Sequence, residues 1–148
     1  MNLIKYCLVS VVFLSALSIT GCKDDEPSIS ETEQQLIALQ NNGKNWIIGS
    51  DRILKDGIDV TDRFSGFKLS IGNKTYTTEN GISPVWPSSG TWEFHSNNPQ
   101  LLLRDDGVLI SVSITSNKLT LTFAAEAVPI GGRKSSVAGE YLFNLVSE

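Results

Sequence analysis

Few side chains of this sequence have the types and spacing that catalytic chemistry requires. His95 is the only histidine, and a lone imidazole without cysteine partners seldom forms a zinc site, so we predict a surface or rim residue and no metal. Asp105 and Asp106 offer two carboxylates of the kind that glycosidases use. Adjacent side chains in a tight turn point apart and lie in water, where no pKa is shifted for acid catalysis. We therefore expect this pair to serve the turn.

The segment Gly131-Gly132-Arg133-Lys134 combines backbone N–H groups with two cations, which is the chemistry of an anion cradle. It lacks the spacing and the helix of a phosphate-binding loop, so we interpret it as a flexible connection. The chain also has no Gly-x-Ser-x-Gly motif and no second histidine, which leaves no nucleophile and base pair. The sequence therefore predicts a protein that is not an enzyme and needs no cofactor.

Cys22 is the residue whose chemistry is best defined by its surroundings. Residues 1–21 carry one charge, Lys5, followed by an apolar run that is shorter than a membrane-spanning helix and ends in small residues. This pattern is typical of a secretory signal. Ile19-Thr20-Gly21-Cys22 resembles the bacterial lipoprotein lipobox, which implies diacylation of the Cys22 thiol and cleavage before it. An ordinary signal peptide with an incidental cysteine is the alternative.

A charged run, Lys23, Asp24, Asp25 and Glu26, follows Cys22 directly. It resembles the lipoprotein export signal of the Bacteroidota, which implies display on the outer face of the outer membrane. A solvated tether in a periplasm-facing protein is the alternative. We expect residues 22–33 to form the lipidated cysteine and a flexible tether that contains Pro27. Two or three acyl chains, at about 0.8 kcal/mol per buried CH₂, are enough to hold a protein on a membrane.

Composition limits what the remaining chain can do. The only other cysteine, Cys7, leaves with the leader, so the mature domain has neither a free thiol nor a disulfide. Loss of Lys5 makes the formal net charge one unit more negative than the −4 of the whole chain. An acidic protein is a poor partner for nucleic acid. Residues 34–148 have the size of one domain with its own core.

The pattern of the body predicts a short helix followed by many short strands. Ser30 and Glu33 have capping-box spacing, and an apolar face predicts a helix over Glu31–Gln40. After Gly43 the apolar period is two, with turn residues at short intervals. The predicted strands lie near residues 45–50, 52–55, 67–71, 74–78, 91–95, 100–104, 108–114, 119–123 and 136–146.

Several turns join neighbouring strands of this prediction. Ser116-Asn117 joins the two clearest strands, and Asp106-Gly107 is a favoured hairpin turn because a positive φ is needed there. Gly72-Asn73 is a further turn signal. The fold class is therefore all-β, and we favour a small antiparallel up-and-down barrel of about eight strands over a sandwich because closure removes exposed edges.

Several segments, taken in order, resemble the lipocalin-like lipoproteins of the Bacteroidota, which are small acylated β-barrels. They are residues 43–46, 56–61, 84–87, 89–94, 104–107 and 139–143. The resemblance implies that Trp46 is a structural residue at the base of the barrel, where Arg133 or Lys134 stacks on it as a cation–π pair. The spacing before Trp46 is one residue longer than in true lipocalins, whose glycine precedes this tryptophan by two residues.

The segment from Glu79 to Ser89 is too stiff and apolar for a simple spacer, because Ile82, Val85 and Trp86 lie around Pro84 and Pro87. We predict a lid. If Trp86 points inward, it plugs or lines a cavity; if it points outward, it anchors a glycan or a protein. A loop folded against the barrel wall is the alternative.

By analogy with the fold, we expect a surface-exposed binding module for a small apolar or carbohydrate ligand. The competing expectation is an accessory interaction subunit of an outer-membrane complex, because a barrel of this size is either hollow or filled with side chains. Large inward residues favour a filled barrel: Trp46, Phe67, Trp92, Phe94, Phe123, Tyr141 and Phe143.

Overall fold

Residues 28–126 and 137–148 are described by the structure, which is a computed structural model. Cys22, the charged run Lys23 to Glu26, and Arg133 with its neighbouring glycines and Lys134 lie outside the described residues, so the predictions made for them stay predictions. Within residues 28–126 and 137–148, no helix is both long enough and apolar enough to cross a membrane.

The predicted N-terminal helix is confirmed as α1 (Glu31–Gln40). The Ser30 side chain accepts a hydrogen bond from the Glu33 N–H at 3.2 Å, which satisfies one free donor of the first turn. The helix ends at Asn41, which adopts a left-handed conformation and leads into the short 3₁₀ turn η1 (Asn41–Gly43). Leu39 is the buried residue of α1, so the helix is joined to the core near its C-terminal end.

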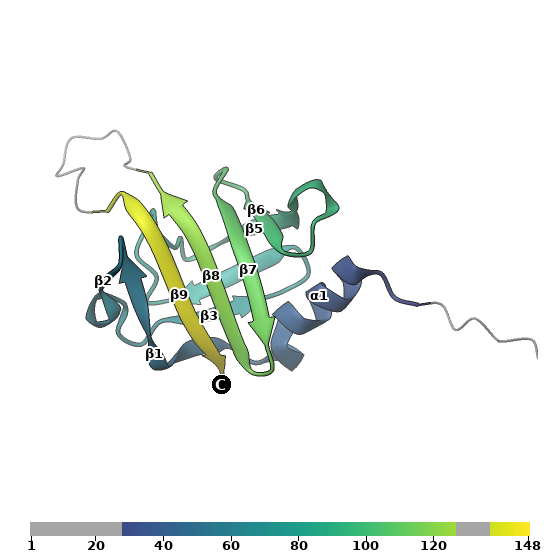
Figure 1. The fold of residues 1–148 in the computed structure, drawn as a ribbon, viewed down its shortest axis with the longest axis horizontal. Helices are drawn as coiled ribbons and strands as arrows, with labels where there is room; N and C mark the ends of the chain where they lie inside the picture. The colour runs from purple at the N-terminus through teal and green to yellow at the C-terminus, as the bar shows by residue number, and fades with distance from the viewer. Residues whose placement is uncertain (1–27, 127–136) are drawn as a thin grey trace, which may run out of the picture.

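The described residues after η1 form nine strands of one antiparallel sheet, eight of which close into a barrel (Figure 1). The sheet order is β2-β1-β3-β4-β5-β6-β7-β8-β9, and β1 also pairs with β9. The strands are β1 (Trp46–Lys55), β2 (Ile58–Asp59), β3 (Lys68–Ile71), β4 (Thr75–Glu79), β5 (Ser89–Phe94), β6 (Leu101–Arg104), β7 (Leu109–Thr115), β8 (Lys118–Ala125) and β9 (Gly139–Ser147). The predicted all-β barrel is therefore correct.

The predicted hairpins are present; the turn at Ser116-Asn117 has two residues, whereas the turn at Asp106-Gly107 is longer than the two residues predicted. Thr115 pairs with Lys118 across Ser116-Asn117, and Ser116 has a positive φ of 54°. Leu103 pairs with Leu109 around the turn that contains Asp106-Gly107, and Gly107 has a φ of 87°. A side chain is strained at such a φ, which explains the glycine. The turn signals in the sequence therefore placed these strands correctly.

The prediction of two separate strands at residues 45–50 and 52–55 is wrong. The structure has one continuous strand, β1, whose pairing with β9 changes register between Ile48 and Ile53. Trp46 and Ile53 are both buried although they are an odd number of residues apart. Side chains alternate between the faces of a strand, so both can point inward only if extra residues bulge out between them.

β3 pairs only with the first residues of β1. The rest of this edge is covered by the 3₁₀ turn η2 (Thr61–Phe64) and the residues next to it. The Ile53 N–H donates to Thr61 Oγ1 at 2.9 Å, and the Val60 N–H donates to the Ile53 carbonyl at 2.9 Å. These bonds use backbone groups of β1 that would otherwise form an open edge. Phe64 enters the core from this turn and is almost fully buried.

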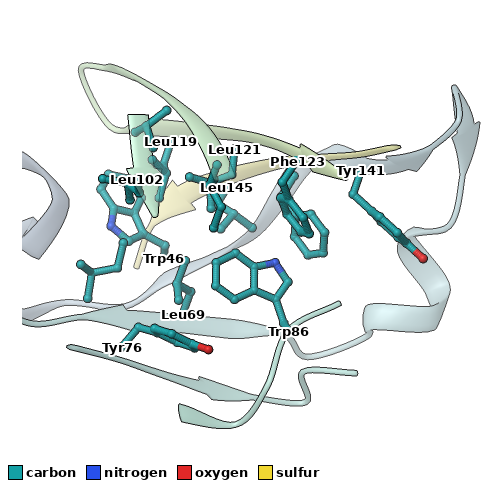
Figure 2. Close-up of a cluster of buried hydrophobic side chains, with 14 of the residues drawn as sticks. Trp46, Leu69, Tyr76, Trp86, Leu102, Leu119, Leu121, Phe123, Tyr141 and Leu145 are labelled. Atoms are coloured by element: carbon teal, nitrogen blue, oxygen red, sulfur yellow. The ribbon is translucent and has the colours of Figure 1, made fainter. Parts of the chain in front are cut away.

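The two ends of the barrel differ in what covers them. Trp46, at the start of β1, lies at the end that holds α1, and its Nε1 donates to the Leu39 carbonyl at 2.8 Å. The C-terminus returns to the same end: the Glu148 N–H donates to the Asn45 carbonyl at 3.0 Å. Figure 2 shows Trp46 and Leu119 at one side of the core, with Trp86, Phe123 and Tyr141 farther along it.

Candidate functional site

The loop between β4 and β5, residues 80–88, folds into the end of the barrel opposite α1; we call it the lid. Its Trp86 side chain is 3% exposed and points into the interior (Figure 2). Of the orientations considered from the sequence, the inward one is therefore present. The indole lies among aromatic rings, with ring centroids 5.6 Å from Tyr76, 5.5 Å from Phe123 and 6.1 Å from each of Phe67 and Phe143.

The other two predicted binding residues of the lid do not form an outer surface. Val85 is 1% exposed, and Ile82 is partly buried against the core. The lid also bonds to itself, because the Trp86 N–H donates to the Ile82 carbonyl at 2.9 Å. All three residues thus contribute to packing in the described conformation.

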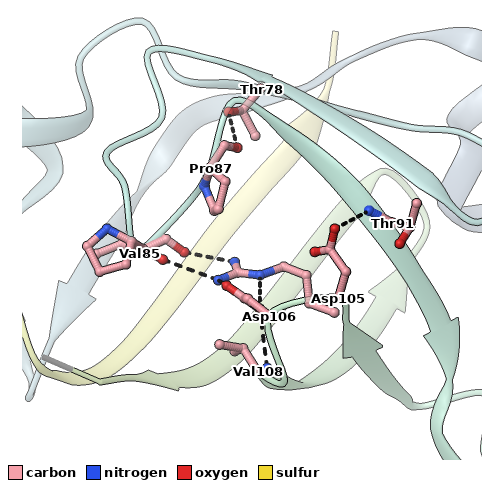
Figure 3. A network of polar contacts seen from close by, with 9 residues as sticks. Thr78, Val85, Pro87, Thr91, Asp105, Asp106 and Val108 are labelled. Atoms are coloured by element: carbon pink, nitrogen blue, oxygen red, sulfur yellow. Dashed lines mark hydrogen bonds and ion pairs between the residues drawn. The ribbon is translucent and has the colours of Figure 1, made fainter. Parts of the chain in front are cut away.

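The C-terminal end of the lid is fastened to β4 by Thr78. Its N–H donates to the Ser88 carbonyl at 2.8 Å. Its hydroxyl donates to the Pro87 carbonyl at 2.9 Å, as Figure 3 shows. Gly81 allows the lid to fold this tightly, because a Cβ at that position would lie 2.6 Å from the Trp86 carbonyl oxygen. The sequence of the lid therefore suits one compact shape.

Arg104, at the end of β6, is the polar centre of this site. It is 1% exposed, and its guanidinium forms a two-pronged pair with Asp106, with Nε–Oδ1 at 2.9 Å and Nη2–Oδ2 at 2.6 Å. The remaining donors hold the lid: Nη1 donates to the Val85 carbonyl at 2.8 Å and Nη2 to the Pro84 carbonyl at 3.2 Å (Figure 3). Arg104 is thus a latch between the barrel and the lid.

The same guanidinium stacks on the aromatic core. Its central carbon lies 5.1 Å from the Trp86 ring centroid and 5.9 Å from that of Phe123. Such cation–π contacts contribute more when they are shielded from water, as here. Sequence reasoning placed the predicted cation–π pair at Trp46 and missed this one. The available signal was alternation, because Arg104 shares the inward face of β6 with buried Leu102.

Asp105 and Asp106 do not act as a pair of carboxylates. Asp106 faces Arg104, whereas Asp105 accepts a hydrogen bond from the Thr91 N–H of β5 at 3.1 Å. The Asp105 N–H in turn donates to the Thr91 carbonyl at 3.0 Å. Both residues therefore hold the β6–β7 turn in place, which fits the turn role expected for them.

Burial would raise the pKa of the Asp106 carboxyl, but the hydrogen bonds and charge of Arg104 outweigh it and the pKa is lowered. Because the pKa is lower in the folded state than in the unfolded state, the ionised carboxyl stabilises the fold at pH values above the unfolded-state pKa of about 3.9. This stabilisation is lost as the pH falls through the folded-state pKa. We expect Asp106→Asn to flatten the decline of stability below about pH 4. Urea unfolding followed at pH values from 3 to 7 measures this.

An identical acid decline in the wild type and in Asp106→Asn would contradict the assignment. Asp56 and Asp59 also have lowered pKa values, Asp56 mainly through a hydrogen bond from the Glu140 N–H and Asp59 mainly through the Thr61 hydroxyl. Part of the decline therefore remains in the variant. The Asp56→Asn protein is the matched control, because its carboxyl is exposed and makes no contact with the lid.

The cavity next to the Trp86 indole is small. It lies between Tyr76, Trp86, Trp92 and Arg104 and has a volume of about 20 Å³. A single water needs about 10–15 Å³ of such volume, so this cavity is too small for an organic ligand. Two buried polar atoms near this space, the Tyr76 hydroxyl and Trp86 Nε1, have no hydrogen-bond partner among the described residues.

The remaining predicted residues lie away from the lid. His95 is in the 3₁₀ turn η3 (His95–Asn97) and is partly exposed. Residues 28–126 and 137–148 contain no group of three or more His, Cys, Asp or Glu side chains that could hold a metal ion. An open groove of about 590 Å³ runs over the outer face of β5 between Lys74 and Asp105, and Glu93 also lines it.

No family model, curated protein or solved structure gives a significant match to this chain. Function is therefore inferred from the residues and their geometry. The barrel interior with its lid is the most specifically built part of the described chain, because a buried charge, a loop tryptophan and four core aromatic rings meet there.

Proposed function

We propose that this protein is a lipid-anchored module of a bacterial outer membrane, related to the lipocalin-like lipoproteins, whose filled barrel is a scaffold for contact with another outer-membrane protein. The observation that supports this role best is the packing of the interior. Trp86 packs among the strand aromatics, and the cavity beside it has only about 20 Å³, which supports a role for the outer surface.

An apolar patch on that surface supports a protein partner. A groove of about 280 Å³ on the outer face of the barrel is lined in part by Leu54, Leu142 and Thr122. Leu54 and Leu142 are register partners on β1 and β9, so the patch crosses the seam where the barrel closes. Exposed apolar patches commonly mark protein contacts.

The test of this role is photo-crosslinking in host cells with a reactive amino acid at position 142. We expect a covalent adduct with one outer-membrane protein, and we expect Leu54→Asp to abolish it. Ser113, an exposed residue on the outer face of β7, is the control position and should give no adduct. Equal labelling from both positions, or none at all, would contradict the proposal.

The proposed anchor gives a separate prediction. Cys22→Ala should move the protein from the membrane fraction to the soluble fraction, because the acyl chains are the only attachment that the proposal requires. Circular dichroism should show an unchanged β-sheet spectrum, since the strands and buried side chains described lie beyond residue 30. A variant that stayed on membranes through carbonate and salt washes would sink the anchor proposal.

The charged run Lys23 to Glu26 supports exposure at the cell surface. Access of external protease to the protein tests this exposure.

A second candidate function is the binding of a small apolar or carbohydrate ligand inside the barrel. One observation favours it: Trp86, which fills this part of the interior, belongs to a loop, and its Nε1 and the nearby Tyr76 hydroxyl have no hydrogen-bond partner within residues 28–126 and 137–148. Burial of an unpaired polar group costs about 1–3 kcal/mol. A molecule that replaced the lid and bonded to Tyr76 would remove part of this cost. Native mass spectrometry of protein from its own host tests this, because a retained molecule adds mass.

A further inference from the structure

The lid and the latch belong to different parts of the chain, and this division determines what remains when the lid moves. Arg104 and Asp106 lie on β6 and its following turn, whereas Pro84, Val85 and Trp86 lie on the lid. Movement of the lid would leave the pair between Arg104 and Asp106 intact. Nη1 and Nη2 of Arg104 would each lose the hydrogen bond to a lid carbonyl. The space now filled by the indole would become an empty slot.

The contacts that the lid makes describe the chemistry of this slot. A flat bicyclic ring lies between the rings of Tyr76, Phe123 and Phe143, and carbonyl oxygens from the same loop accept hydrogen bonds from the guanidinium above it. The lid thus presents an aromatic ring and an adjacent oxygen acceptor together. Tyr76 adds a buried hydroxyl that has no partner among the described residues.

We infer that the barrel has a latent binding site for a flat aromatic molecule that carries a carbonyl or carboxylate oxygen, and that this molecule enters in place of the Trp86 side chain. The inference rests on the second candidate function above and defines its ligand. The ring takes the place of the indole under Arg104, and the oxygen takes the place of the Val85 carbonyl. Charge-assisted hydrogen bonds are the stronger kind, so a carboxylate competes well with the neutral lid carbonyls.

Two other ligand classes fit the slot less well. A sugar would place hydroxyl groups against the faces of Phe123 and Phe143, which offer no hydrogen-bond partner. A long flexible chain would need depth beyond the slot, but the interior toward α1 is filled by Leu119, Leu145 and Trp46, each no more than 1% exposed. The slot therefore favours a short and flat molecule.

The test uses the full-length chain in detergent with Trp86→Ala, which opens the slot, and isothermal titration with two probes. Indole-3-acetate carries the ring and a carboxylate, whereas 3-methylindole carries the ring alone. We expect indole-3-acetate to bind Trp86→Ala about tenfold more tightly, and we expect Arg104→Met in the same background to remove that preference. Wild type should bind indole-3-acetate measurably but more weakly, because the lid must open first.

Trp46→Ala is the matched control, because it also removes a buried indole but at the end without the arginine. We expect 3-methylindole to bind the Trp46→Ala protein at least as tightly as indole-3-acetate does. If Trp86→Ala does not fold, Trp86→Leu keeps more of the packing and replaces it. Equal affinity of the two probes for the opened slot, or a preference that survives Arg104→Met, would overturn the inference.

The inference and the second candidate function fail in different ways. Absence of indole-3-acetate binding to the wild-type protein would overturn the inference, because exchange with the lid would then not occur. A retained host molecule without an aromatic ring would also overturn it, yet that result would support the second candidate function. Binding of both probes at the same affinity to the Trp86→Ala and Trp46→Ala proteins would also overturn the inference, because each void would then fill nonspecifically.

Discussion

Arg104→Ala is expected to lower the free energy of unfolding by about 3–5 kcal/mol, because breaking a buried ion pair leaves its partners uncompensated. The variant loses both bonds to Asp106 and both bonds to the lid carbonyls of Pro84 and Val85. It also leaves a void beneath the β6–β7 turn. Urea unfolding followed by circular dichroism measures the loss.

Comparison with Arg104→Met separates the polar contribution from the packing contribution. Methionine fills most of the same volume without a charge, and the Asp106 carboxylate that it leaves unpaired is 36% exposed and can be hydrated. We therefore expect a smaller loss, about 1–2 kcal/mol, from the lid carbonyls that lose their donors. If Arg104→Met were as stable as wild type, the hydrogen bonds to the lid would make no net contribution and the latch assignment would be wrong.

The control for this series is an ion pair that makes no contact with the lid. Lys118 pairs with Asp51 at 2.6 Å, but the two side chains are 55% and 34% exposed. Exposed pairs contribute about 0–1 kcal/mol, so Lys118→Ala should change stability little. A loss as large as that of Arg104→Ala would indicate that the ion pairs of this barrel act together.

Trp46→Ala is expected to have an effect of similar size, about 3–5 kcal/mol, for a different reason. The substitution removes a fully buried indole and leaves a cavity between β1 and α1. It also removes the hydrogen bond to the Leu39 carbonyl, which joins the helix to the barrel. Hydrogen exchange should therefore become faster in α1 than in β8, which pairs along its length with β7 and β9.

Trp46→Phe tests the hydrogen bond alone, because the ring stays and the N–H donor is lost. We expect a smaller loss, about 1–2 kcal/mol, with the same preferential loosening of α1. If exchange in α1 were unchanged in both variants, Leu36 and Leu39 alone would hold the helix, and Trp46 would contribute only to the barrel core.

Local pattern was enough to predict the helix and most strands. The bounds of α1 follow from Ser30 and from the apolar residues behind it, and the hairpin from Leu109 to Ala125 follows from simple alternation around Ser116-Asn117. These signals depend on neighbours in the chain. The bulge in β1 was missed because it depends on which residues of β9 lie opposite, and the sequence of β1 alone does not show this.

The site was predicted only in part. The stiff apolar lid was recognised from Pro84, Trp86 and Pro87, but the direction of Trp86 depends on a slot built by strands distant in sequence. Arg104 was placed at the end of the predicted strand at residues 100–104, and its burial was not predicted, since charged side chains are rarely buried without partners. Its partners include carbonyl groups about twenty residues earlier, and a short motif does not reveal them.

The position of the two chain ends has a consequence for how the molecule meets its surroundings. The helix that follows the proposed tether and the C-terminal residue Glu148 share one end of the barrel, whereas the lid and the β6–β7 turn lie at the other. A protein held by its N-terminal lipid would stand with its sealed base toward the bilayer. The lid, whose tryptophan points into the barrel, would then face away from the membrane. A molecule arriving from the medium would meet the lid before it met the membrane.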